Sequence, residues 1–186
     1  MTVEQLLSEA RGKMGKAIGV LKDDLAAIRT GRASPAVLAR IVVDYYGTQV
    51  PINQLASFSV PEPRTLVVQP FDKGGISAME KAIQSSDLGI TPSNDGNVIR
   101  LSFPPLTEER RKELVKVLHA RAEEARVAVR NIRRHEKEAM ERLEREHAIS
   151  EDELSRGEKE LQKLTDQFVA EIDEIQRHKE QELLEV

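Results

Sequence analysis

Residues 107–149 read TEERRKELVKVLHARAEEARVAVRNIRRHEKEAMERLEREHAI, and residues 150–186 continue SEDELSRGEKELQKLTDQFVAEIDEIQRHKEQELLEV. These stretches contain no proline and a single glycine, Gly157, so nothing in them forces a long helix to break. Thr107 is placed to cap a helix N-terminus, with Glu108 and Glu109 near the positive end of its dipole. Ser150 and Glu153 have the spacing of a capping box. The sequence therefore predicts one helix from about residue 107 to 147 and another from Ser150.

Apolar residues in both helices recur every three or four positions, which places them on one narrow stripe of each helix. The stripes comprise Leu114, Leu118, Ala125, Ala128, Ile132, Ala139 and Leu143, then Leu154, Leu161, Leu164, Phe168, Ile172, Ile175 and Leu183. Residues 1–30 carry a third stripe, made of Leu7, Ala10, Met14, Ala17, Leu21, Leu25 and Ile28. The short connection at 148–150 makes the second and third helices antiparallel neighbours. We therefore predict an elongated three-helix bundle formed by residues 1–30 and 107–186.

The segment between these helices, residues 31–106, has a different texture and holds all eight prolines. Its β-rich runs predict strands over 38–45, 49–52, 58–60, 65–71 and 98–103, with a short helix over 76–88. The fold class is therefore α+β, with a small domain inserted between the first two long helices. The connections at 30–35 and 103–107 must lie side by side, because the chain leaves and re-enters the bundle there. We predict that they act as hinges, although a rigid elbow would use the same residues; the candidates are Gly31, Ser34, Pro35, Pro104 and Pro105.

Several classes of activity lack their sequence signals. The chain has no cysteine, which excludes disulfides, thiolate zinc sites and cysteine nucleophiles. Asp72-Lys73-Gly74-Gly75 lacks the spacing of a phosphate-binding loop or a dinucleotide motif. The pair His135-Glu136 has no second histidine ligand at position 139, so we interpret it as solvated charge on a helix. We predict no catalytic residues, no metal and no cofactor.

The apolar runs are too short to span a membrane, and the first residues do not resemble a targeting signal. We therefore expect a cytoplasmic protein with no membrane contact.

A basic run interrupts the alternating charges of the second long helix. Residues 125–134, ARVAVRNIRR, hold four arginines and no acidic residue. Their spacing of i, i+4, i+7 and i+8 places them on one helical face, and the planar guanidinium suits bidentate phosphate contacts. The four are Arg126, Arg130, Arg133 and Arg134.

This arginine face has two interpretations. Residues 150–186 hold 12 acidic and 5 basic residues, so individual arginines can pair with the third helix. The functional interpretation is a contact with an RNA backbone, which needs most of the face at once. Phe168 is the one aromatic residue of the helices and lies in the apolar stripe, so recognition should rest on phosphates and shape rather than on base stacking.

Other functions use the same features. One is a general RNA-binding or chaperone-like coiled coil, which would bind many RNAs with similar affinity. Another is a helical adaptor whose arginines dock an acidic protein without RNA. A nucleotide- or metal-dependent enzyme is a remote third.

Motifs along the whole chain resemble those of the ribosome recycling factor family. They are RTGRASP at 29–35, DYYGT at 44–48, QLAS at 54–57, PPLTEERRK at 104–112, ARVAVRNIRR at 125–134 and ISED at 149–152. The first twenty and last fifteen residues carry no diagnostic motif.

The resemblance implies an L-shaped molecule with a three-helix bundle and a small β/α/β domain. It implies a non-enzymatic monomer that binds large-subunit ribosomal RNA on the intersubunit face. Together with elongation factor G and GTP hydrolysis, it would split ribosomes after termination of translation. By position, Arg130 and Arg133 correspond to the family's RNA contacts, with Arg126 and Arg134 as adjacent candidates. Arg29 and Arg32 are weaker candidates, because packing of the connection explains them equally well.

Overall fold

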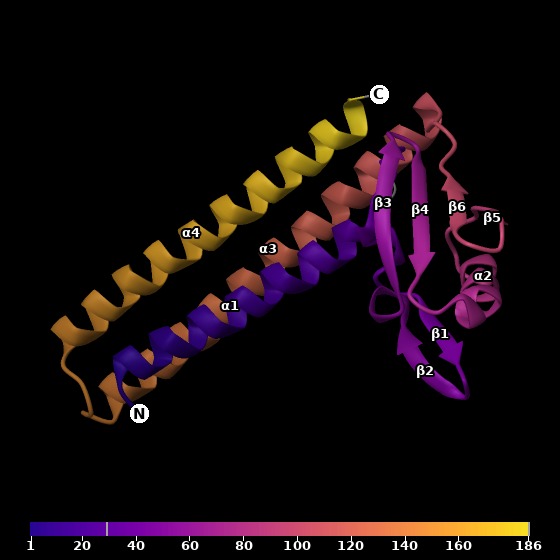
Figure 1. Ribbon diagram of the computed structural model, residues 1–186. Helices are drawn as coiled ribbons and strands as arrows, with labels where there is room; N and C mark the ends of the chain where they lie inside the picture. Colours follow the sequence, from indigo (N-terminus) through magenta and orange to yellow (C-terminus); the bar gives the residue numbers. More distant parts are fainter. Residues whose placement is uncertain (29, 186) are drawn as a thin grey trace. The chain divides into compact units, whose positions relative to one another are not determined.

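The protein, described here by a computed structural model over residues 1–28 and 30–185, has the predicted α+β fold class (Figure 1). It divides into two compact units. One contains residues 1–25 and 112–185, and the other contains residues 26–111. The inserted segment therefore forms a unit of its own.

Three long helices form the first unit: α1 (Val3–Ala26), α3 (Glu108–Arg145) and α4 (Glu151–Leu184). In Figure 1, α3 runs antiparallel to both α1 and α4. Thr107 Oγ1 accepts the backbone N–H of Arg110 at 3.1 Å at the start of α3. Ser150 and Glu153 form both hydrogen bonds of the capping box. Both predicted helix starts are confirmed.

The bundle core follows the predicted periodicity, but its members differ in part. Leu6 and Ile18 are buried in α1, whereas the predicted Leu7 and Ala17 are only half-buried. The larger or better centred aliphatic side chain fills the seam, and its neighbour lies at the edge. On α3, Val129 and Met140 likewise take core positions, while Ala128, Ile132, Ala139 and Leu143 are half-buried. On α4, Leu154, Phe168 and Ile175 are half-buried.

The bundle seam also contains a charged residue and a glycine. Glu136 is 3% exposed, and Lys13 Nζ donates to its Oε1 at 2.8 Å. The expectation that Glu136 is solvated charge is therefore wrong, because the Lys13 ammonium compensates the carboxylate inside the bundle. Gly157 is also buried, and a Cβ there would lie 2.8 Å from Val3 Cγ1 and 3.1 Å from Met140 Sδ. This glycine allows the three helices to approach closely.

The second unit contains two antiparallel sheets. Strands β1 (Val42–Tyr45) and β2 (Thr48–Pro51) form a hairpin whose two turn residues, Tyr46 and Gly47, have φ of 49° and 83°. Positive φ at both positions is the signature of a type I′ turn. The other sheet has the order β3 (Ala56–Glu62), β4 (Thr65–Pro70), β6 (Ile99–Ser102) and β5 (Pro92–Asn94).

Helix α2 (Ile76–Gln84) packs against β1 and β5 and closes an entirely apolar core. The core includes Leu38, Val43, Ile52, Leu66, Val68, Met79, Ile83, Ile99 and Leu101. Short 3₁₀ turns at Pro35–Leu38, Ile52–Gln54 and Lys73–Gly75 join the elements.

Several sequence-based boundaries in this unit are wrong, and the strand predicted over 58–60 extends over Ala56–Glu62. The strand predicted from residue 38 begins at Val42, because residues Pro35–Leu38 form a 3₁₀ turn. The predicted helix 76–88 ends at Gln84. Residues Pro92–Asn94, which lie outside every predicted strand, form the short edge strand β5. Short elements such as these depend on tertiary pairing more than on local propensity.

The two connections to the bundle lie side by side within the second unit, as the topology required. Gly31 has φ +83°, and a Cβ there would lie 3.5 Å from Leu106 Cγ. The N–H of Ala33 donates to the carbonyl of Pro63 at 2.7 Å, and that of Phe103 donates to the carbonyl of Arg64 at 2.8 Å. Both connections are therefore fastened to the β3–β4 turn.

None of the helices over residues 1–28 and 30–185 combines the length and the apolarity needed to cross a membrane.

Candidate nucleic-acid interface

Helix α3 presents the four predicted arginines in two different environments. Arg130 and Arg134 are exposed, whereas Arg126 and Arg133 are half-buried toward α4. Helix α4 therefore covers part of Arg126 and Arg133 and leaves Arg130 and Arg134 open to solvent.

Arg126 is engaged within the bundle. Its Nε and Nη2 donate to Asp173 Oδ1 on α4 at 2.9 and 2.7 Å, and Nη2 also donates to Gln176. Its Nη1 donates to Glu123 at 3.3 Å, and only 17% of the side chain is exposed. Pairing with the acidic third helix, the alternative interpretation, is thus observed for Arg126. Of the four arginines, it is the least available to a ligand.

Arg130 has an acidic partner on its own helix. Its Nη1 lies 3.4 Å from Glu123 Oε1, and about half of each side chain is exposed, 53% for Arg130 and 56% for Glu123. Solvent reaches both groups, so this ion pair contributes little to stability. Arg130 remains accessible to an anion, but a carboxylate already lies beside it.

Arg133 and Arg134 have uncharged partners. Arg133 Nη1 donates to Gln162 Oε1 on α4 at 3.1 Å, and Arg134 Nη2 donates to Asn131 Oδ1 at 3.3 Å. An amide orients a guanidinium without neutralising it. In the C-terminal half of the arginine face, the positive charge is therefore not offset by a neighbouring carboxylate in the contacts that hold these two side chains.

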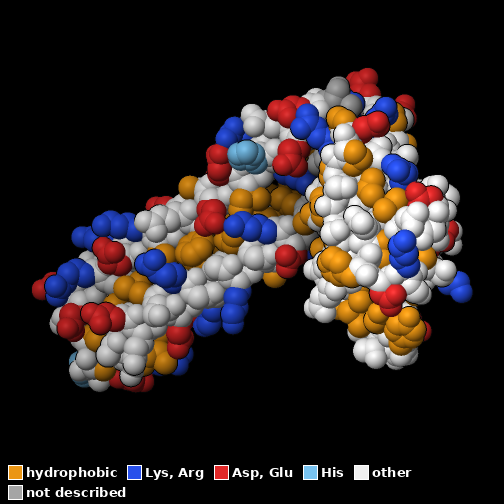
Figure 2. All heavy atoms as spheres, in the orientation of Figure 1, with side chains coloured by type: hydrophobic (Ala, Val, Ile, Leu, Met, Phe, Trp, Pro, Cys, Tyr) orange, Lys and Arg blue, Asp and Glu red, His pale blue; other side chains and the backbone are white. Residues whose placement is uncertain are grey.

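This local arrangement matters because the bundle carries no extensive field of one sign on the face that Figure 2 shows. Lys and Arg side chains alternate there with Asp and Glu side chains. A phosphate chain that approached this face would meet charges of both signs.

The remaining predicted contacts belong to the second unit or fall outside the structure. Arg32 is exposed and lines a hollow together with Val60–Pro63. Arg29 lies outside the described residues.

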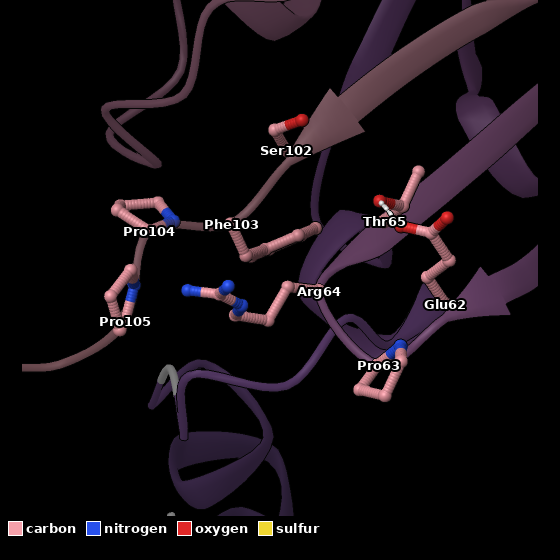
Figure 3. Close-up of a pocket in the computed structure, with 8 residues that line it drawn as sticks. All are labelled: Glu62, Pro63, Arg64, Thr65, Ser102, Phe103, Pro104 and Pro105. Carbon is pink, nitrogen blue, oxygen red and sulfur yellow. Dashed lines mark hydrogen bonds between the residues drawn. The ribbon is translucent and has the colours of Figure 1, made fainter.

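The predicted hinge residues occupy ordered surroundings. Ser34 Oγ accepts the N–H of Ala36 at 3.3 Å and caps the 3₁₀ turn that Pro35 begins. Pro104 and Pro105 line a groove of about 580 Å³, toward which the Arg64 side chain extends (Figure 3). On the wall opposite the two prolines, Thr65 Oγ1 donates to Glu62 Oε2 at 3.5 Å (Figure 3). Ser34 and Pro35 are therefore fixed by local hydrogen bonding and ring geometry.

Within residues 1–28 and 30–185, no group of three or more His, Asp or Glu side chains is arranged to hold a metal ion.

One residue of the interface, Glu123, is not among those predicted from the sequence, although a signal for it exists. Glu123 precedes Arg126 by three positions and Arg130 by seven, which places all three on one side of the helix. The partners on α4, Asp173 and Gln162, depend on the register between α3 and α4, which the sequence does not reveal.

Known proteins resemble this chain over almost its whole length. The ribosome recycling factor family profile matches residues 21–184. A ribosome-recycling factor of Carboxydothermus hydrogenoformans is 58% identical, and one of Acidothermus cellulolyticus is 54% identical. Each alignment covers 99% of this chain and all of the relative.

Solved structures agree with the sequence relatives. A solution structure of the ribosome recycling factor is 47% identical, with a TM-score of 0.83, and the match covers 99% of this chain and 98% of that one. A second structure describes the T. thermophilus ribosome recycling factor and E. coli elongation factor G bound to the E. coli post-termination complex. The match to it is 50% identical, with a TM-score of 0.71, and covers 99% of this chain and all of that one. The chain belongs to the ribosome recycling factor family.

Proposed function

We propose that this protein recycles ribosomes after termination of translation. It binds the RNA of the large subunit on the intersubunit face and, with elongation factor G and GTP hydrolysis, splits the post-termination ribosome into subunits. The protein performs no chemistry itself and acts as a monomer in the cytoplasm. The observation that carries the proposal is the full-length match to a family member described with elongation factor G on a post-termination complex.

The arginine face supplies the RNA contact. Arg133 and Arg134 contribute most, because their amide partners leave their charge available, and Arg130 contributes through its exposed guanidinium. Arg126 acts mainly by joining α3 to α4. Contacts of this kind are made to phosphates, so binding weakens as salt is raised.

Binding to ribosomes tests this assignment. We expect Arg133→Gln combined with Arg134→Gln to weaken binding to isolated large subunits by roughly tenfold for each arginine–phosphate pair removed, and to reduce the salt dependence. Arg121→Gln combined with Arg177→Gln is the matched control, because it removes the same charge from exposed residues paired with Glu124 and Glu174.

Three outcomes contradict parts of the proposal. Equal weakening in both double variants would mean that net charge, rather than this face, drives binding. Similar affinity for any RNA would favour the general RNA-binding coiled coil. A parent protein that binds no ribosomes would refute recycling and favour the adaptor that docks an acidic protein.

The two connections support a lever that couples the GTPase to the bundle. Hydrogen bonds to the β3–β4 turn hold Ala33 and Phe103, so bending concentrates on the bundle side of these residues, around Gly31 and Pro104–Leu106. At φ +83°, any residue with a Cβ is strained at position 31.

We expect Gly31→Ala to slow the splitting of 70S ribosomes by elongation factor G and GTP, followed by light scattering, while ribosome binding stays near the parent value. Gly96→Ala is the control, because Gly96 has φ +89° and open space around it. A lever is contradicted if binding and splitting fall together, or if the control slows splitting equally.

A further inference from the structure

We infer that Glu123 limits how tightly the arginine face holds RNA, so that the factor leaves its site after each round of splitting. This inference rests on the proposed function and adds a residue that regulates the same interface. It starts from the carboxylate that lies beside Arg126 and Arg130.

Both oxygens of Glu123 are used, one for each arginine. Oε2 lies 3.3 Å from Arg126 Nη1, and Oε1 lies 3.4 Å from Arg130 Nη1. Arg126 already has Asp173 at 2.7 Å, so it does not need a second carboxylate for neutralisation. The distinctive effect of Glu123 is therefore on Arg130, whose Nη1 donates to this residue.

The Glu123–Arg130 contact is open to competition. Both side chains are more than half exposed, and the nitrogen–oxygen distance of 3.4 Å is long for a charge-assisted hydrogen bond. An exposed pair of this kind is stabilised only weakly. A phosphate can therefore displace the carboxylate from Arg130 without disturbing the bundle.

The displaced carboxylate still opposes the phosphate. A phosphate seated on Arg130 would lie roughly 6 Å from Glu123, and two like charges at that distance in water cost about threefold in affinity. The factor grows where bound RNA excludes solvent, and it falls as salt screens the charges. Glu123 thus lowers affinity at every round of binding.

A recycling factor acts repeatedly, so release is part of its task. Within one interface, tighter binding appears mainly as slower dissociation. An arginine face with no carboxylate beside it would therefore stay on the RNA for longer. Glu123 weakens the attraction of an RNA phosphate to the exposed guanidinium of Arg130. The expected consequence is faster turnover without loss of the splitting step itself.

Glu123→Gln tests the inference, and Glu124→Gln is its matched control. Glu124 is the adjacent residue, is 63% exposed and pairs with Arg121 instead, so the control makes the same charge change away from Arg130. At low salt, we expect Glu123→Gln to bind large subunits about three- to tenfold more tightly, mainly through slower dissociation. Multiple-turnover recycling should slow relative to the parent.

Several results would overturn the inference. Affinity of Glu123→Gln equal to or below that of the parent would mean that Glu123 is neutral or positions Arg130 for binding. An equal gain in Glu124→Gln would assign the effect to net charge. A gain that persists unchanged in high salt would exclude an electrostatic cause.

The same assay separates this inference from the function on which it rests. If the parent binds and Arg133→Gln with Arg134→Gln does not, the interface stands, and an unchanged Glu123→Gln refutes only the role of Glu123. If the arginine variants bind like the parent, the interface itself is wrong.

Discussion

The bundle and the small domain fix their internal registers in different ways. The bundle buries the charged Glu136 at 3% exposure, whereas in the small domain the buried polar residue Thr30, at 9%, lies in a connection to the bundle. A repeating apolar seam can slide by a helical turn, and the buried Glu136 carboxylate, which accepts a hydrogen bond from Lys13 on another helix, opposes such a slide. The sheets of the small domain are instead fixed by turns, such as the Tyr46-Gly47 hairpin. We therefore expect substitutions of polar residues to change stability inside the bundle and, in the small domain, at its turns.

The largest expected effects come from truncating each core separately. Leu66 and Leu118 are both fully buried, one in each unit. We expect Leu66→Ala and Leu118→Ala each to cost about 2–5 kcal/mol of the free energy of unfolding of its own unit.

Two spectroscopic signals distinguish the units. Both tyrosines lie in the small domain, and the chain has no tryptophan, so tyrosine fluorescence reports that unit. Far-ultraviolet circular dichroism reports mainly α1, α3 and α4, of 24, 38 and 34 residues. Leu66→Ala should shift the fluorescence transition and Leu118→Ala the dichroism transition. If both variants shift both signals equally, the two units unfold as one.

Overpacking the seam of the bundle should cost less. Gly157→Val would place a side chain against Val3 and Met140, and we expect a loss of about 1–3 kcal/mol, measured by urea unfolding. Gly12→Val is the control on an exposed helix position, where a Cβ meets nothing within 4 Å. Gly12→Val should leave the stability unchanged or raise it slightly, because valine has the higher helix propensity. An equal loss in both variants would mean that close helix packing does not explain the cost at Gly157.

The ion pair between Lys13 and the buried Glu136 should show a smaller effect, because Lys13 is about half exposed and water reaches it. Its hydrogen bond to Glu136 raises the pKa of Lys13 above the ordinary value. We expect Lys13→Met to lower the Tm of the bundle, because the Glu136 carboxylate stays buried without its partner. Adding Glu136→Leu should restore the Tm, since an apolar residue removes the buried charge.

Lys16→Met is the control for this pair, because Lys16 is exposed on the same helix. If the control lowers the Tm as much, or if Glu136→Leu fails to rescue, the pair does not fix the register of α1 against α3.

The same contrast explains what the sequence could predict. Apolar periodicity and capping residues locate α3 and α4, because these signals are local to each helix. The buried Glu136 could not be predicted, because its burial depends on Lys13, 123 positions away along the chain. In the small domain, the break between the strands predicted over 38–45 and 49–52 contains the Tyr46-Gly47 turn, whereas β5 exists only through its pairing with β6.

The arginine face shows the same limit. The spacing of Arg126, Arg130, Arg133 and Arg134 places them on one side of α3, as predicted. Whether Arg126 and Arg133 have a carboxylate or an amide partner depends on which residue of α4, Asp173 or Gln162, lies at that level. That choice belongs to the helix register, which periodicity does not determine.

The smallest expected effect concerns a turn of the small domain and depends on pH. The hydroxyl of Tyr45 donates to Asp72 Oδ2 at 2.7 Å, and this bond lowers the pKa of Asp72 and raises that of Tyr45. A lowered carboxyl pKa stabilises the fold above the ordinary value of about 3.9, and the contribution is lost as pH falls through the folded value. A raised tyrosine pKa stabilises the fold below about 10, and that contribution is lost as pH rises through the folded value.

Tyr45→Phe should therefore lower the Tm of the small domain slightly at pH 7, and the difference from the parent should shrink at both extremes of pH. Calorimetry is the suitable measurement, because the substitution removes a fluorescent group. Tyr46→Phe is the control, since its hydroxyl lies 3.3 Å from the same carboxylate and the residue is 76% exposed. A loss that does not vary with pH would assign the effect to the Tyr45 ring, whose Cε2 lies 3.0 Å from where a Cβ of Gly75 would be. In that case, packing of the Tyr45 ring over Gly75 would hold the turn at Lys73–Gly75. The small domain would then need no polar side-chain contact to fix this turn against β1.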